Sequence, residues 1–251
     1  INEVISHDLA LSSKILKLVN SAYYGFPRRI SSITHAVVIL GFQTIRNIAL
    51  SAFVFDAFES GDLPFGYRSF WIHSVGVAAA ANVIGSRQGV PLSEDPFMCG
   101  LLHDVGKLVL HQRLKKDFVK VLQRVESEKL PIFEAERKVL GTDHAEVGGL
   151  LMEHWKLPEK MVWALSFHHS PQKVAEADRR LAATVHAADV LARSLLIGCS
   201  GDYLVPAMAP EAWETLNLSA DDLPELMQAI STDMAKVGAF IELVQGASNA
   251  Q

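Results

Sequence analysis

The sequence predicts an all-α fold, and three observations support this. Apolar residues recur at intervals of three and four, as in Ile33, Ala36, Val37 and Leu40, which is the period of one helix face. No segment alternates apolar and polar residues for long enough to predict a strand. Gly and Pro lie between the periodic segments, where they commonly end or begin helices. We therefore expect a two-lobed helical fold.

A break in the periodicity at residues 59–66 is rich in Gly, Pro and acidic residues and predicts a boundary between lobes. A turn-rich stretch after residue 198 predicts a second boundary. The parts expected are an N-terminal helical lobe at 1–58, a larger helical lobe at 67–198, and a C-terminal helical extension at 199–251.

Several helix boundaries carry capping signals. Gly41 predicts the end of the helix that begins near Ile33. Asp143 and Asp95 predict N-caps, and Pro96 after Asp95 suits the first helical turn. The later helices are expected at 174–197, near 210–216 and near 221–244.

Composition and charge argue against several classes of function. The net charge of −5 predicts no electrostatic attachment to nucleic acid or to acidic lipid. No run of about 20 uncharged apolar residues predicts a membrane span. The two cysteines, Cys99 and Cys199, form no CxxC pair and lie in apolar surroundings, so we expect buried thiols in a cytoplasmic protein.

An ordered series of histidines and aspartates predicts a metal site. At its centre, His103 and Asp104 are expected on a helix, where adjacent side chains point about 100° apart and can reach one ion in a groove. Neutral imidazole and ionised carboxylate suit Fe, Mn, Zn, Ni or Co better than Mg or Ca. We expect one or two divalent ions. The predicted ligands are His73, His103, Asp104, His144, His168, His169 and Asp189.

A structural role is the competing interpretation. A single histidine on an apolar helix, such as His73, is more often a packed core residue, and an His-Asp dipeptide arises often by chance. The longer series favours metal binding. His186, one turn before Asp189, is expected to support a ligand rather than to be one. The histidines assigned to surface or core packing are His7, His35, His111 and His154.

If the protein is an enzyme, Asp104 and Lys107 are the candidate catalytic residues. A carboxylate such as Asp104 can bridge two ions roughly 3.5–4 Å apart, and ions so placed lower the pKa of a bound water that acts as nucleophile. Lys107 lies one turn after His103 and could meet an anionic ligand or a structural carboxylate.

The histidine series resembles that of the HD superfamily of metal-dependent phosphohydrolases. The N-terminal lobe narrows the resemblance to the HDOD domain, a signal-output relative of those enzymes, and this resemblance extends to about residue 200. It implies a helical, two-lobed bacterial cytoplasmic regulator that works with receiver, kinase or cyclic-di-nucleotide domains. The strings that carry it are Asn20-Ser21-Ala22-Tyr23-Tyr24-Gly25, Ile30-Ser31-Ser32-Ile33, Ala36-Val37-Val38-Ile39-Leu40-Gly41 and Ile45-Arg46-Asn47-Ile48.

This sequence departs from its relatives in two ways. Most HDOD domains are expected to lack the metal ligands, whereas here the ligand positions are largely filled. The cyclic-di-GMP phosphodiesterase branch carries Gly-Tyr-Pro after its His-His pair, where this chain has Ser170-Pro171-Gln172. That branch often has a carboxylate one turn before the first histidine, where this chain has Ser69.

Three functions therefore remain open. The first is a metal-bearing signalling module that binds a partner or a small, phosphate-containing ligand. The second is a metal-dependent phosphohydrolase or phosphodiesterase that acts on a nucleotide or cyclic dinucleotide. The third is a scaffold whose histidines are idle.

Overall fold

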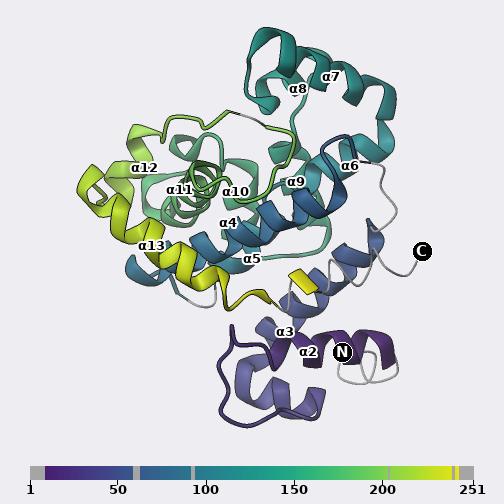
Figure 1. Cartoon of the computed structure of the whole chain (residues 1–251), viewed down its shortest axis with the longest axis vertical. Helices are drawn as coiled ribbons and strands as arrows, with labels where there is room; N and C mark the ends of the chain where they lie inside the picture. Colours follow the sequence, from purple (N-terminus) through teal and green to yellow (C-terminus); the bar gives the residue numbers. More distant parts are fainter. Residues whose placement is uncertain (1–8, 59–62, 92–93, 203, 239–240, 243–251) are drawn as a thin grey trace. The chain divides into compact units, whose positions relative to one another are not determined.

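The computed structural model of the chain describes residues 9–58, 63–91, 94–202, 204–238 and 241–242 (Figure 1). These residues form helices and connecting loops with no strand among them, which confirms the all-α prediction. Contacts divide the chain into two compact units. Unit 1 comprises Ile1–Ser60 and Ser231–Gln251, and unit 2 comprises Gly61–Ile230.

Among the described residues of unit 1, two helices of its N-terminal segment are joined by an ordered loop. They are α2 (Leu9–Val19) and α3 (Ile33–Ala57). The side chain of Asn20 closes the loop, because it accepts a hydrogen bond from the Ile30 amide at 2.7 Å and donates to the Ile30 carbonyl at 2.8 Å. Gly41 interrupts α3 with a φ of 79°, so the predicted break is confirmed.

By length and composition alone, α3 is apolar enough to cross a membrane, a test that the core helix of a soluble protein also passes. Arg46 lies in the middle of the apolar segment, and Gly41 breaks its helical geometry. Both features favour a helix that packs within a protein.

Unit 2 consists of short helices around α4 and α11 (Figure 1). Their bounds are α4 (Tyr67–Arg87), α5 (Pro96–Leu102), α6 (Val105–Arg113), α7 (Lys115–Glu128), α8 (Ile132–Leu140), α9 (His144–His154), α10 (Glu159–Ser166), η2 (Pro171–Lys173), η3 (Glu176–Asp178), α11 (Arg180–Ser194), α12 (Pro210–Thr215), η4 (Ala220–Asp222) and α13 (Leu223–Met234), of which residues up to Ile230 belong to unit 2.

Small side chains let α4 and α11 pack closely at the centre of unit 2. Ala80 and Ala81 of α4 share a buried apolar cluster with Ala187 and Ala188 of α11. Leu216, after α12, and α13 complete this cluster. Two helices with such small facing side chains can hold the residues that they carry in a fixed register.

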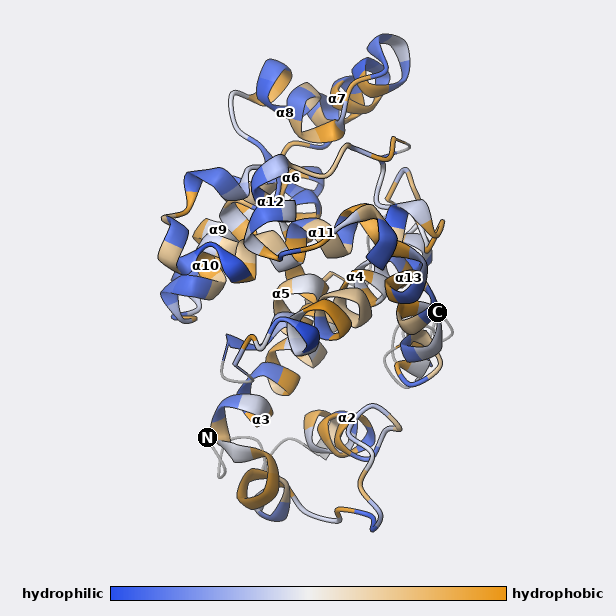
Figure 2. Cartoon of the chain, turned by 90° about the vertical axis from the view of Figure 1, so that its left-hand side faces the viewer, coloured by the Kyte–Doolittle hydropathy of each residue, from blue (hydrophilic) through white to orange (hydrophobic). Residues whose placement is uncertain are grey.

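The helices α7 and α8 form a hairpin with a core of its own. Phe118 and Val121 of α7 pack with Ile132 and Ala135 of α8. Figure 2 shows hydrophobic and hydrophilic residues on different sides of α7, as expected for a helix with one buried face.

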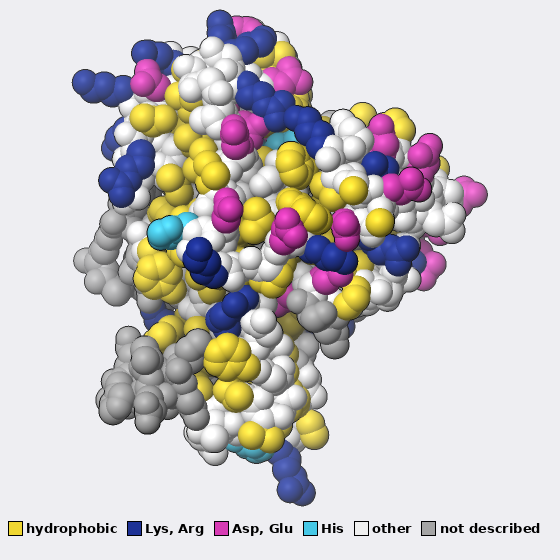
Figure 3. Space-filling model, turned by 180° about the vertical axis from the view of Figure 1, so that it is seen from behind, with side chains coloured by type: hydrophobic (Ala, Val, Ile, Leu, Met, Phe, Trp, Pro, Cys, Tyr) yellow, Lys and Arg dark blue, Asp and Glu magenta, His cyan; other side chains and the backbone are white. Residues whose placement is uncertain are grey.

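On the face in Figure 3, basic and acidic side chains lie among one another, which is the pattern of a solvated surface.

Two helices differ from their predicted bounds. α11 begins at Arg180 rather than near residue 174, because residues 171–178 form two 3-10 turns separated by extended backbone at Val174. α13 ends at Met234 rather than near residue 244. There, hydrogen bonds between residues three apart replace the α-helical pattern. The end of the predicted span, residues 243–244, lies outside the described residues.

Candidate metal centre

His103 and Asp104 lie at the junction of two helices, so the prediction that they share one helix was wrong. α5 ends at Leu102, and Asp104 precedes α6 with φ −98° and ψ 3°. The chain turns here because α6 packs against α9. A Cβ atom at Gly106 would overlap the carbonyl oxygen of His144, so only glycine permits this approach. The close packing sets Asp104 beside the start of α9.

The predicted caps also help to place the site. The Asp95 carboxylate accepts a hydrogen bond from the Met98 amide at 3.0 Å and begins α5. The Asp143 carboxylate accepts from the Glu146 amide at 2.9 Å and begins α9. Both N-caps are confirmed, and they fix the start of the helices that lead into the site.

The structure brings the seven predicted ligands together from separate elements of unit 2. His73 lies on α4, His144 begins α9, Asp189 lies on α11, and His168 and His169 follow α10. The inner group is defined as His73, His103, Asp104 and Asp189, and the outer group as His144, His168 and His169.

In the inner group, ring nitrogens face carboxylate oxygens. His73 Nε2 lies 3.1 Å from Asp189 Oδ1 and 3.9 Å from Asp104 Oδ2. His103 Nε2 lies 3.3 Å from Asp104 Oδ2 and 3.8 Å from Asp189 Oδ1. All four residues are at most 1% exposed. The donor atoms therefore converge on one buried point.

The outer group adjoins the inner group through Asp104. His144 Nε2 lies 3.1 Å from Asp104 Oδ1 and 2.9 Å from His169 Nε2. The His168 ring lies beside both, with its centroid 3.9 Å from that of His169 and 5.4 Å from that of His144. One nitrogen from each of the three histidines lies within 4.8 Å of the others, so they form a second set of converging donors.

Backbone carbonyls fix the tautomer of three of these histidines. A carbonyl only accepts, so the Nδ1 atom that faces it donates, and a neutral ring then presents a lone pair at Nε2. Burial lowers the pKa of His73 and His168, which favours the neutral ring. The Nδ1–carbonyl pairs are His73 with Ile197 at 3.2 Å, His103 with Gly100 at 2.7 Å and His168 with Leu165 at 2.7 Å.

Two buried cations hold the aspartates in the ionised form. Lys107 Nζ donates to Asp104 Oδ2 at 2.8 Å, and Arg193 Nε donates to Asp189 Oδ1 at 2.8 Å. Burial raises the pKa of both carboxyl groups, but the charge of Lys107 keeps that of Asp104 well below its usual range. Arg193 does the same for Asp189. Lys107 thus meets a structural carboxylate, one of its two predicted partners.

His144 is held by a carboxylate rather than by a carbonyl. Its Nδ1 lies 2.6 Å from Oε2 of Glu136, which is itself fully buried on α8. Burial lowers the pKa of His144, but the Glu136 charge outweighs this and raises it to about 9. Glu136 therefore orients the ring, as carboxylates commonly do for metal-bound histidines.

Unpaired buried atoms test whether these residues fit a metal ion. His73 Nε2, His103 Nε2 and His168 Nε2 are buried without a hydrogen-bond partner. Such atoms are costly to bury unless something satisfies them. Lone pairs and carboxylate oxygens repel one another and attract a cation. The donor set of imidazole and carboxylate therefore fits a divalent transition metal.

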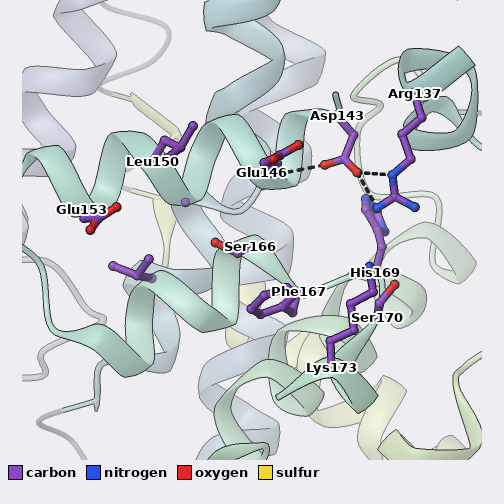
Figure 4. Close-up of a pocket in the computed structure, with 12 residues that line it drawn as sticks. Arg137, Asp143, Glu146, Leu150, Glu153, Ser166, Phe167, His169, Ser170 and Lys173 are labelled. Atoms are coloured by element: carbon purple, nitrogen blue, oxygen red, sulfur yellow. Dashed lines mark hydrogen bonds and ion pairs between the residues drawn. The ribbon is translucent and has the colours of Figure 1, made fainter. Parts of the chain in front are cut away.

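His169 connects the ligand set to a cavity of about 360 Å³ (Figure 4). The His169 ring is half-buried and stacks on Phe133, with centroids 4.4 Å apart. The cavity wall carries both signs of charge, with Arg137 and Lys173 beside Asp143, Glu146 and Glu153, and Arg137 Nε donates to Asp143 Oδ2 at 2.6 Å. The cavity therefore meets the ligand set at His169.

His186 supports a ligand, as the sequence suggests. Its Nδ1 donates to the His168 carbonyl at 2.7 Å, and its Nε2 accepts from the Ala209 amide at 2.9 Å. Both ring nitrogens are thus engaged by backbone, which leaves none for a metal. The ring fixes the position of the segment that carries His168.

The other histidines and the cysteines, which were expected at the surface or in the core, differ in how far they are buried. His35 and His154 are exposed, and His111 is buried against Phe118. His7 lies outside the described residues. Cys99 is buried as predicted, whereas Cys199 is only half-buried.

Four residues that support the site were not predicted from the sequence: Arg193 and Glu136, which contact ligands, and Ser200 and Asp202, which contact the buried cations. Arg193 was detectable, because it lies four residues after Asp189 on one helix, the spacing of a side-chain ion pair. Glu136 carried only a weak signal, a carboxylate on the buried face of an amphipathic helix. Ser200 and Asp202 carried none, because their partners Lys107 and Arg193 lie on other elements.

The chain is similar in sequence and fold to known proteins. The family model of the HDOD domain matches residues 1–171. An HDOD domain protein of unknown function from Geobacter sulfurreducens has a TM-score of 0.77 and 29% identity, with coverage of 95% of this chain and 85% of that one. A Shewanella amazonensis SB2B protein, named a phosphohydrolase without an established activity, has a TM-score of 0.69 and 26% identity, with coverage of 97% and 85%.

An uncharacterized protein of Treponema pallidum is 28% identical over 193 residues, which are 76% of this chain and 37% of that protein. The chain thus spans little more than a third of that curated relative. The family match, by contrast, covers well over half of this chain and includes His73, His103, Asp104, His144, His168 and His169. The chain belongs to the HDOD domain family.

Proposed function

We propose that the chain is a bacterial cytoplasmic signal-transduction module that carries a divalent transition metal ion in its HD-like lobe. The ion would be held by the inner group, and the outer group is where a second ion would bind. The module would act by binding a partner, such as a receiver, kinase or cyclic-di-nucleotide domain, or a small ligand. The metal would stabilise or sense rather than catalyse.

The observation that carries this proposal is the set of buried, unpaired donor atoms in the inner group. His73 and His103 present Nε2 lone pairs toward two ionised carboxylates, with no hydrogen bond to satisfy them. A purely structural histidine would be expected to pair both nitrogens, as His186 does. A bound ion would satisfy these atoms, with Lys107 and Arg193 offsetting part of the carboxylate charge.

Burial supports a regulatory rather than a catalytic role. A substrate must reach the metal, yet the inner group is at most 1% exposed. Lys107, the candidate for contact with a phosphate, is fully buried and is bound by Asp104 and Ser200. The missing Gly-Tyr-Pro and the serine at position 69 point the same way.

The metal content of protein purified without chelator tests the proposal. We expect about one equivalent of a divalent transition metal per chain, or two if the outer group also binds. His103→Ala should lose the inner-group metal, whereas His154→Ala, which changes an exposed histidine, should retain it. Native protein that is free of transition metal would overturn the proposal.

A metal-dependent phosphohydrolase remains the second candidate, and the cavity at His169 favours it. A phosphate-bearing nucleotide or cyclic dinucleotide could approach the outer group through this opening, with Arg137 and Lys173 on its wall. A bound metal would supply an activated water, and Asp104 would face both groups of donors. Hydrolysis by metal-loaded protein that disappears in His103→Ala and persists in His154→Ala would establish this function.

A further inference from the structure

A short segment between α11 and α12 runs along the ligand set. It comprises residues 197–202, which have no regular secondary structure, and is called the strap here. The Ile197 carbonyl accepts from His73 Nδ1 at 3.2 Å, and the Cys199 amide donates to the Ser69 carbonyl at 3.1 Å. Gly198 lies so close to α4 that a Cβ atom would overlap the His73 backbone.

The strap also holds the cations that pair with both ligand aspartates. Ser200 Oγ accepts from Lys107 Nζ at 3.1 Å, and the same ammonium donates to Asp104. Asp202 Oδ2 lies 2.7 Å from Arg193 Nη1, and that guanidinium also donates to Asp189. Three of the four inner-group residues are thus connected to the strap. His73 contacts it directly, Asp104 is connected through Lys107, and Asp189 is connected through Arg193.

From the strap the contacts continue to the α7–α8 hairpin. Asp202 Oδ2 accepts from the Ile132 amide at 3.2 Å, where α8 begins. A Cβ atom at Gly201 would press on the rings of Phe65 and the side chain of Ile132, which belong to the hairpin's apolar cluster. The same helix carries Glu136, which orients His144. The strap therefore joins the ligand set to the hairpin.

We propose that the strap is a conformational switch whose order depends on the metal, so that metal binding is communicated to the α7–α8 hairpin. This inference rests on the proposed metal site. A bound ion would fix His73, Asp104 and Asp189, and these residues in turn fix the strap. When the ion leaves, lone pairs and carboxylates repel one another, and the strap loses its anchors. Coupling of this kind is reciprocal, so the strap must also strengthen metal binding.

Cys199 provides a probe within the strap, and Cys99 provides an internal control. Cys199 is half-buried, whereas Cys99 is fully buried and burial raises the pKa of its thiol well above the usual range. The native chain would be labelled with N-ethylmaleimide in two separate conditions, one with a chelator and one with excess Mn²⁺. Bound Mn²⁺ would be measured by electron paramagnetic resonance. Mn²⁺ is chosen because it binds thiols weakly. Loss of the label in the Cys199→Ala variant would show that Cys199 is the cysteine that reacts.

We expect Cys199 to react about tenfold or more faster without metal, while Cys99 stays slow in both conditions. Equal Cys199 rates, with Mn²⁺ shown to be bound, would overturn the switch and leave the metal site standing. An equal increase at both cysteines would mean that the whole unit opens, which also contradicts a local switch. If neither Mn²⁺ nor any other transition metal binds, both proposals fail.

The reciprocal effect is tested by substitution in the strap. Asp202→Asn should weaken metal binding by about 10- to 100-fold, the range for residues that support metal ligands. Asp221→Asn makes the same chemical change at an exposed position and should leave the affinity unchanged. Equal affinities for Asp202→Asn and the native chain would contradict the coupling.

Discussion

At the scale of single residues, the site is built from groups that fix one another. Carbonyls hold the rings of His73 and His103, and cations hold the two aspartates. Arg193 has the largest share of these contacts, since it lies between Asp189 and Asp202. Its pKa is raised by the two carboxylates despite the opposing effect of burial.

Arg193→Leu should therefore destabilise unit 2 strongly. It leaves two buried carboxylates without their cation, a change that typically costs about 3–5 kcal/mol in free energy of unfolding. Arg113→Leu removes an exposed arginine and should change that free energy by less than about 0.5 kcal/mol. Urea unfolding measures both. Equal stability of the two variants would contradict the role given to the buried ion pairs.

Asn20 has an equivalent role in unit 1, within the string that identifies the family. Its side chain makes three hydrogen bonds, two to Ile30 and one to the Leu16 carbonyl at 2.7 Å. Asn20→Ala should lower the free energy of unfolding by about 1–3 kcal/mol, because half-buried backbone groups lose their partner. Gln43→Ala, an exposed amide on α3, serves as the control in the same urea titration.

At the scale of elements, the packing of α6 on α9 determines where Asp104 lies. Gly106→Ala places a methyl group against the His144 carbonyl, so α6 must shift. We expect a loss of about 1–3 kcal/mol from overpacking, together with reduced metal content because Asp104 moves. Gly148→Ala lies at the same contact but meets neighbours only at 3.7–3.8 Å. It should fold and bind metal as the native chain does.

Local patterns in the sequence were sufficient for the helical class, the break at Gly41 and the caps at Asp95 and Asp143. They were not sufficient where a contact between distant parts of the chain determines the helix boundary. The His103-Asp104 helix break depends on how closely α6 approaches α9, and periodicity cannot reveal this. The predicted start of α11 was wrong for a related reason, since residues 175–177 are Ala and Glu, which favour a helix, but the chain there forms a 3-10 turn after extended backbone at Val174.

The same distinction applies to the candidate site. The histidine and aspartate ligands were selected by residue type and order, and the structure brings all seven together. The residues that support these ligands were harder to predict, because they come together from distant parts of the sequence. Asp202, for example, accepts a hydrogen bond from the Ile132 amide, 70 positions away. No local pattern encodes a contact of that range. The residues selected from the sequence therefore converge in the structure, whereas the network that supports them was not predicted.

At the scale of the whole molecule, a tightly bound metal should stabilise the fold by mass action. At a free concentration 100 times the dissociation constant, the gain is about 2.7 kcal/mol. For a chain of this size that corresponds to a rise of roughly 5–10 °C in melting temperature. Calorimetry with and without a strong chelator measures it. Coincident melting curves would instead support a scaffold with idle histidines.

Anomalous scattering from crystals of the native chain, grown without chelator and measured at transition-metal absorption edges, tests the metal centre directly. We expect an anomalous peak bounded by His73, His103, Asp104 and Asp189, and the absorption edge would identify the metal. His103→Ala crystals should lack this peak. Native crystals with no anomalous peak among these four residues would contradict the account.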